Sequence, residues 1–402
     1  MKMRINILLY LIFYNFLSYS QSTEIYTQSS SLNYLKIPKD ALSSSLGGSA
    51  SFLYPTFQNG QINPALTTLI ENQNIISLSF IPWQWYSFID KGKSYLIDLG
   101  YSHNIKGRHF LSTQLHFLNH GELQLRNSDF EEIGNNSGYD LGILINYGFK
   151  INPNFSIGIE GKLCNSKLLN NVSTISSIQN LSNIWIPLLS IGLNYEKEFK
   201  NKNKINIGLS ALNLGPKISY NKNNYFFLPS KILLYFNYQL NINDENSFSF
   251  NFQSEKYLVP FVNSSTYSNS NISEDNIVSE NINSIPLFKG WAKSFNVPNS
   301  KTPISYLNSF QNSLGIEYAY KKIFFTRLGL SHMGQSYGGL SKLHAGVGVS
   351  INAFSVHLSY ETTLSNGVQN YNPTNNTLKI SLFYNWRKIK TSIKIKCPPS
   401  NN

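Results

Sequence analysis

The sequence predicts an all-β protein, a 14-stranded antiparallel transmembrane β-barrel with an N-terminal plug segment. Three observations lead to this prediction. The last strand-like stretch alternates between apolar and polar residues, the links between strand-like stretches alternate between short and long, and the chain begins with an export signal. A bacterial outer-membrane barrel shares all three properties.

The closing strand lies at residues 376–386. Apolar side chains recur at every second position, which places them on one face of a strand: Leu378, Ile380, Leu382, Tyr384 and Trp386. A final strand that ends in an aromatic ring suits the boundary between lipid and water. An edge strand of a soluble sandwich shows the same pattern, so this stretch alone leaves both folds open.

The first 20 residues have the pattern of a secretory signal peptide. Lys2 and Arg4 precede an apolar run over residues 5–17, and a small residue, Ser20, stands before Gln21. The mature chain is therefore expected to begin at Gln21. After this signal no uninterrupted apolar stretch reaches the roughly 18–20 residues of a membrane helix.

The amino-acid composition indicates which classes of partner to expect. Charged residues make up 13% of the chain, and the formal net charge is +12. The basic residues are scattered singly and form no stripe interleaved with aromatic residues, so we expect no nucleic-acid partner. The two cysteines, Cys164 in an expected strand and Cys397 in the tail, are not expected to form a structural disulfide.

Residues 21–73 precede the first strand and lack its alternation. They contain small residues and glycines, which favour tight packing, and Pro38 favours a short helix after it. The stretch has too few large apolar residues to be a domain. Because a barrel of 14 strands encloses more space than its own side chains fill, these residues are the expected plug.

Residues 74–386 form the expected barrel. Strands are predicted at residues 74–81, 94–103, 109–126, 138–151, 155–169, 185–200, 205–215, 230–241, 246–259, 310–321, 324–333, 342–352, 354–363 and 376–386. Polar residues occupy the alternate, inward positions, for example Asp140, Asn237, Gln239, His357 and Glu361. Strands buried on both faces would be apolar on both.

The links decide between a sandwich and a barrel. Every second link is short, such as 152–154, whereas the links between them are longer, the longest being 260–309. Tight periplasmic turns and long outer loops produce this parity in outer-membrane barrels. A soluble sandwich has no reason to follow it.

Several motifs, in this order and spacing, resemble the PorV family of type IX secretion, which is itself similar to FadL-like barrels. The plug carries Pro38, Asp40 and Ala41, then Gly47 and Gly48, then Asn63, Pro64 and Ala65. Later motifs include residues 119–123, 212–217, 255–260 and 314–318. Ser43 to Ser45 depart from a family run that is usually richer in glycine.

The resemblance implies a function without catalysis. A PorV-like protein binds the C-terminal signal domains of secreted cargo and shuttles them from the large outer-membrane translocon to a cell-surface sortase. The alternative is a FadL-like transporter of hydrophobic small molecules, which needs an apolar lumen; the polar inward positions lean against it. Both functions place the protein in the lipid of the cell outer membrane.

Exposed aromatic residues in outer loops are the candidate partner-binding residues. Trp83 and Trp85 belong to the first outer loop and also fit the aromatic girdle of a barrel. Trp291 and Phe295 lie in the 260–309 loop, which should rise above the membrane. We therefore expect this loop to help hold cargo or translocon.

No catalytic, cofactor-binding or metal site is expected. His116 and His120 share a strand face, but no carboxylate or cysteine cluster accompanies them. The sequence has no nucleophile elbow or glycine-rich phosphate loop. The basic tail, residues 387–402, is expected to be a solvated end.

Overall fold

The computed structural model describes most of the chain. The described residues are 26–70, 73–83, 94–126, 132–168, 182–222, 224–263, 284–298, 306, 309–334, 339–364 and 374–387. The predicted signal peptide, Trp85 and nearly all of the basic tail lie outside them.

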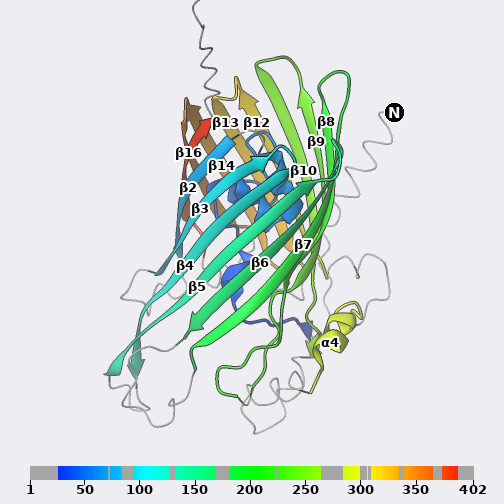
Figure 1. Cartoon of the computed structure of the whole chain (residues 1–402). Helices are drawn as coiled ribbons and strands as arrows, with labels where there is room; N and C mark the ends of the chain where they lie inside the picture. The colour runs from blue at the N-terminus through cyan, green and yellow to red at the C-terminus, as the bar shows by residue number, and fades with distance from the viewer. Residues whose placement is uncertain are drawn as a thin grey trace, which may run out of the picture.

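Fourteen antiparallel strands form a closed barrel (Figure 1). They are β2 (Gln73–Trp83), β3 (Ser94–Lys106), β4 (His109–Arg126), β5 (Glu132–Lys150), β6 (Phe155–Lys167), β7 (Ile184–Glu198), β8 (Lys204–Leu214), β9 (Lys231–Asn241), β10 (Asn246–Tyr257), β12 (Gln311–Tyr320), β13 (Phe324–Met333), β14 (Ser341–Ile351), β15 (Phe354–Thr363) and β16 (Thr377–Arg387). The last strand closes the barrel by pairing with the first, with Leu382 opposite Leu78. The predicted strand number, order and closure are confirmed.

The two faces of the wall differ in chemistry. Along β6, Ile157, Ile159 and Leu163 are exposed on the outside, while Glu160 and Lys162 are buried on the inside. The predicted inward residues Asp140, Asn237, Gln239, His357 and Glu361 are all buried. Apolar side chains outside and polar side chains inside are what a barrel in lipid requires.

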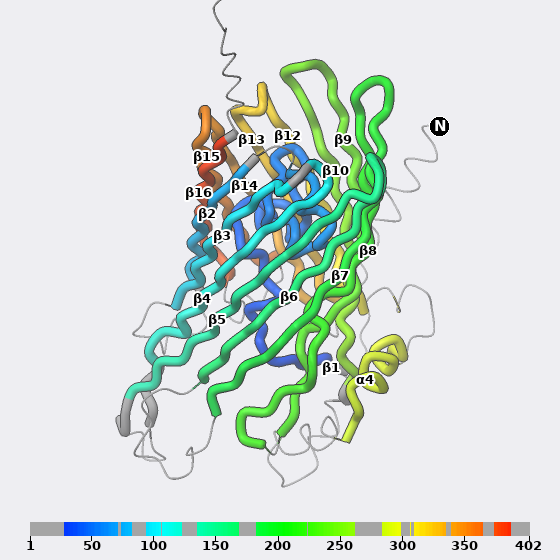
Figure 2. The backbone as a smooth tube through the Cα atoms, viewed as in Figure 1, coloured from blue at the N-terminus to red at the C-terminus, as the bar shows by residue number. Residues whose placement is uncertain are grey.

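Residues 28–70, here called the luminal segment, lie inside the barrel (Figure 2). They form η1 (Asn33–Lys36), α2 (Ala41–Ser45), η2 (Phe57–Gln61) and η3 (Pro64–Leu69). At one end β1 (Tyr26–Thr27) pairs with β11 (Val262–Asn263). At the other end residue 70 leads toward β2, so the segment runs through the barrel from one mouth to the other.

The two mouths are distinguished by their links. Short turns join strands at the mouth where β2 begins, which is therefore the periplasmic mouth. The longest link, between β10 and β12, lies at the outer mouth and contains β11 and α4 (Leu287–Lys293). Among the described residues, none of the helices has the length and apolar character needed to cross a membrane.

Candidate functional site

Asp40 and Ala41 fix the short helix of the luminal segment to the barrel wall. The Asp40 carboxylate caps α2 by accepting a hydrogen bond from the Ser43 amide at 2.8 Å. The Ala41 amide donates to Ser381 Oγ on β16, also at 2.8 Å. Because its burial disfavours charge, the pKa of Asp40 is raised, although the bonds from Ser43 oppose the shift.

Gly47 and Gly48 end this helix close to the wall. Both have positive φ angles, 72° and 96°, a conformation that favours glycine. A Cβ added to Gly329 on β13 would lie 2.4 Å from the Gly47 amide nitrogen. The two backbones therefore touch with no room for a side chain, and Pro38 packs beside Gly48.

Asn63, Pro64 and Ala65 make the second close contact with the wall. Asn63 caps η3 by accepting from the Ala65 amide at 2.9 Å, and its side-chain nitrogen donates to the Leu193 carbonyl of β7 at 2.8 Å. A Cβ on Gly158 of β6 would lie 2.2 Å from the Pro64 carbonyl carbon. All eight plug residues singled out in the sequence thus belong to the luminal segment.

Buried charges of the wall also hold the luminal segment. Glu317 on β12 pairs with Arg327 on β13 at 2.8 Å, and both side chains are fully buried. The same carboxylate accepts hydrogen bonds from Ser51 Oγ at 2.8 Å and from the Leu53 amide at 3.1 Å. The luminal segment therefore supplies hydrogen-bond donors to an ion pair that lies in the barrel wall.

A second buried network surrounds Glu361 of β15. Lys379 of β16 and Lys342 of β14 both pair with its carboxylate, the latter at 3.2 Å. Lys379 also donates to Ser44 Oγ in α2 at 2.6 Å. The buried Lys379 and the partly buried Lys342 thus share one carboxylate partner, which offsets the cost of burying their charges.

The two histidines noted on one strand face in the sequence form separate pairs. His116 is buried in the lumen against Asp98, and His120 lies 3.0 Å from Asp140 nearer the rim. Across the described residues, no three His, Cys, Asp or Glu side chains gather in a way that would hold a metal ion. Cys164 is buried, with its sulfur 3.3 Å from the Tyr34 hydroxyl.

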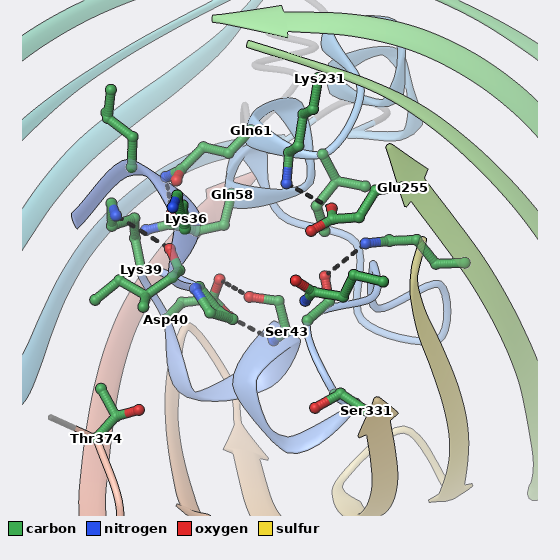
Figure 3. Close-up of a pocket in the computed structure, with 18 of the residues that line it drawn as sticks. Lys36, Lys39, Asp40, Ser43, Gln58, Gln61, Lys231, Glu255, Ser331 and Thr374 are labelled. Atoms are coloured by element: carbon green, nitrogen blue, oxygen red, sulfur yellow. Dashed lines mark hydrogen bonds and ion pairs between the residues drawn. The ribbon is translucent and has the colours of Figure 1, made fainter. Parts of the chain in front are cut away.

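A cavity separates the luminal segment from the wall in the outer half of the barrel (Figure 3). Its cavity volume is about 120 Å³. Five lysines line it together with three acidic residues: Lys36, Lys39, Lys162, Lys231 and Lys342, and Asp40, Glu255 and Glu361. We call it the outer cavity. Its lining residues come from segments far apart in the chain, so no sequence pattern pointed to it.

At the outer mouth, α4 presents aromatic side chains. Trp291 is half-buried against a cluster that contains Phe227, Tyr257 and Val259. Phe288, whose ring centroid lies 5.3 Å from that of Trp291, is 75% exposed, and Phe295 is 41% exposed. Phe288 was missed in the sequence, where nothing distinguishes it from the many other phenylalanines.

Trp83, predicted to lie in the first outer loop, is the last residue of β2, and its backbone lies opposite Ser94 of β3.

Comparisons with known proteins begin with solved structures. The Pseudomonas putida toluene transporter TodX shares 13% identity, with 86% of this chain and 96% of that chain covered and a TM-score of 0.45. A Pseudomonas aeruginosa FadL homologue shares 9% identity, with 87% and 98% covered and a TM-score of 0.45. Among curated proteins no match was found.

A family model matches more than half of the chain. The model for the type IX secretion system protein PorV covers residues 20–264, which include the luminal segment and the wall as far as β11. The resemblance seen in the sequence is thereby confirmed, and the protein belongs to the PorV family of type IX secretion.

Proposed function

We propose that this protein is a non-enzymatic carrier of type IX secretion in the outer membrane, exported by residues 1–20. It binds the C-terminal signal domains of secreted cargo at its outer face. It then carries them from the translocon to a surface sortase. Residues 21–73 act as its plug.

The exposed aromatic side chains on α4 and just after it are the observation that carries this proposal. Phe288 on α4 and Phe295, two residues after its end, are exposed, and Trp291 packs the helix against the outer mouth. Figure 1 shows α4 at this mouth of the barrel. Large aromatic side chains held on a rigid support are typical centres of protein interfaces. These side chains are therefore suited to a protein partner, either cargo or translocon.

The lumen supports a carrier better than a conduit. The luminal segment is bonded to the wall at several levels, for example through Ser381, Glu317 and Leu193. The wall residues around it are largely polar, which disfavours passage of hydrophobic small molecules. Binding at the outer face requires no open channel.

Affinity capture tests the proposal. The tagged protein, extracted from outer membranes in mild detergent, is expected to retain cargo signal domains, translocon or sortase. The double variant Phe288→Ser/Phe295→Ser should lose at least one of these partners. Phe199→Ser, at a periplasmic turn, is the matched control and should retain them all. Wild-type protein that brings down fatty acid and no secretion partner would contradict the proposal.

A further inference from the structure

We propose that the outer cavity is a binding site for the free C-terminal end of a polypeptide, with Lys36 facing the terminal carboxylate. This inference rests on the proposed function and deepens it, because it names the part of the cargo that enters the barrel. Two features of the cavity support it, namely its charges and its unused hydrogen-bonding groups.

The charged residues of the outer cavity do not balance. Three of the lysines have carboxylate partners: Lys231 pairs with Glu255, Lys342 with Glu361 at 3.2 Å, and Lys162 lies 3.4 Å from Glu160. The ion pairs of the described residues include none for Lys36 or Lys39. The cavity therefore has an excess of positive charge.

The Lys39 ammonium is hydrogen-bonded within the protein, whereas no hydrogen bond or ion pair of the Lys36 ammonium is found among the described residues. The Lys39 ammonium donates to the backbone carbonyls of Tyr34 and Ile37. The Lys36 ammonium lies 5.4 Å from the centre of the Tyr257 ring, and the Lys231 ammonium lies 5.7 Å from the same centre. Lys231 already has the Glu255 carboxylate as its partner, so an anion that enters the cavity would gain most from Lys36.

The cavity also contains acceptors that lack donors. Gln253 Oε1 of β10 and Gln311 Oε1 of β12 are buried and have no hydrogen-bond partner among the described residues. Leaving such groups unpaired is costly, so a ligand that supplies N–H donors would bind favourably. Both glutamines line the same cavity as Lys36.

A single kind of ligand could supply both an anion for Lys36 and N–H donors for the two glutamine oxygens. A polypeptide end carries an anion and, within a few bonds of it, backbone N–H donors. A fatty acid has the anion but no N–H group, so it would leave Gln253 and Gln311 unpaired. The lining also includes the apolar residues Leu35, Ile62 and Met333, which suit the aliphatic atoms of the last residue of the chain.

The test compares two pools of random hexapeptides that differ only at the C-terminus. One pool has free carboxylates and the other has amides. Each is passed over the immobilised full-length protein in detergent, and retained peptides are quantified by mass spectrometry. Retention of the acid pool should exceed that of the amide pool about ten-fold, the size of one hydrogen-bonded charge interaction.

Variants assign the preference to Lys36. Lys36→Gln should reduce the ratio of retained peptide acids to retained peptide amides to about one. Lys36→Arg should keep the wild-type ratio, and so should the control Lys322→Gln, which lies at a periplasmic turn. Heat-modifiable migration on gels confirms that each variant is folded. Equal retention of the two pools by wild-type protein, or a preference that survives Lys36→Gln, would overturn the proposal.

Two further outcomes separate this inference from the proposed function. If laurate displaces the acid pool and binds as strongly, the site takes fatty acids and the assignment to a polypeptide end is wrong. If cargo is captured equally by wild-type protein and Lys36→Gln and no acid preference exists, the inference fails while the carrier function stands. An acid preference in a protein that captures no cargo would support the chain-end site and contradict the carrier function.

Discussion

At the scale of single residues, wall glycines set how closely the luminal segment approaches the barrel. Gly158 illustrates this, since a Cβ there would lie 2.2 Å from Pro64 and 2.3 Å from the Ala65 amide nitrogen. Gly161, on the same strand, is exposed and has no atom within 4 Å of such a Cβ. Gly158 is therefore the position to substitute, and Gly161, three residues later, is its control.

We expect Gly158→Ala to destabilise the protein because backbone atoms must move to admit the methyl group. Overpacking of this kind costs about 1–3 kcal/mol. The melting temperature in detergent should fall, and added protease should cleave the luminal segment sooner. Gly161→Ala should match wild type. Equal effects of the two substitutions would show that the segment is not packed on β6.

The protonation of Lys36 gives a second prediction at this scale. Burial, together with the nearby positive charge of Lys231, lowers the pKa of Lys36 to about 8, while Glu255 opposes the shift. Lys36 is therefore charged below pH 8 and neutral well above it. The preference for peptide acids over amides should be strong at pH 7 and should weaken as the pH rises through 8, with the midpoint shifted upward by the bound carboxylate. A preference unchanged at pH 10 would exclude Lys36 as its source.

At the scale of elements, paired strands and the luminal segment stabilise each other through buried charges. Glu317 joins β12 to Arg327 of β13 and to Ser51 and Leu53 of the segment. Glu198, in contrast, pairs with Lys204 at 3.0 Å but is 53% exposed. The two ion pairs differ mainly in burial.

We expect Glu317→Gln to cost about 3 kcal/mol or more, because it leaves the buried Arg327 charge without a counterion. Glu198→Gln should cost less than about 1 kcal/mol, as exposed pairs do. The midpoint of urea unfolding in lipid vesicles, followed by heat-modifiable migration, measures both. Similar midpoints for the two variants would contradict the central role of the buried pair.

The strands were predictable from sequence, and the luminal segment largely was not. Alternation along β15, for example at Val356, Leu358 and Tyr360, records lipid on one side and a polar lumen on the other. The path of residues 28–70 depends instead on contacts with distant strands. Asn63 is hydrogen-bonded to β7 and Ala41 to β16, and no local sequence pattern predicts either contact.

The site was predicted only in part for the same reason. The motif residues of the luminal segment were identified, but the outer cavity combines Lys36 with Gln253 and Gln311, which are more than 200 residues away. Phe288 was missed because exposure, and not residue type, distinguishes it. Trp291 was singled out because it lies in the long outer loop, and in the structure it packs α4 against the outer mouth.

At the scale of the whole molecule, the two mouths of the barrel differ, and the luminal segment runs from one to the other. The luminal segment begins beside β11 at the outer mouth and ends at β2 at the periplasmic mouth. The outer cavity and α4 both belong to the outer half. Cargo binding at α4 and capture of a chain end in the cavity therefore require the same orientation in the membrane.

That orientation can be tested by cysteine labelling in intact cells. In a Cys397→Ser background, which leaves only the buried Cys164, Lys289→Cys places a thiol on the exposed face of α4 and Asn201→Cys places one in the turn between β7 and β8. Because long links face outward and short turns face the periplasm, a membrane-impermeant maleimide should label position 289 in intact cells. Position 201 should react only after the outer membrane is permeabilised. The opposite result would place α4 and the outer cavity on the periplasmic side, where neither could receive cargo at the cell surface.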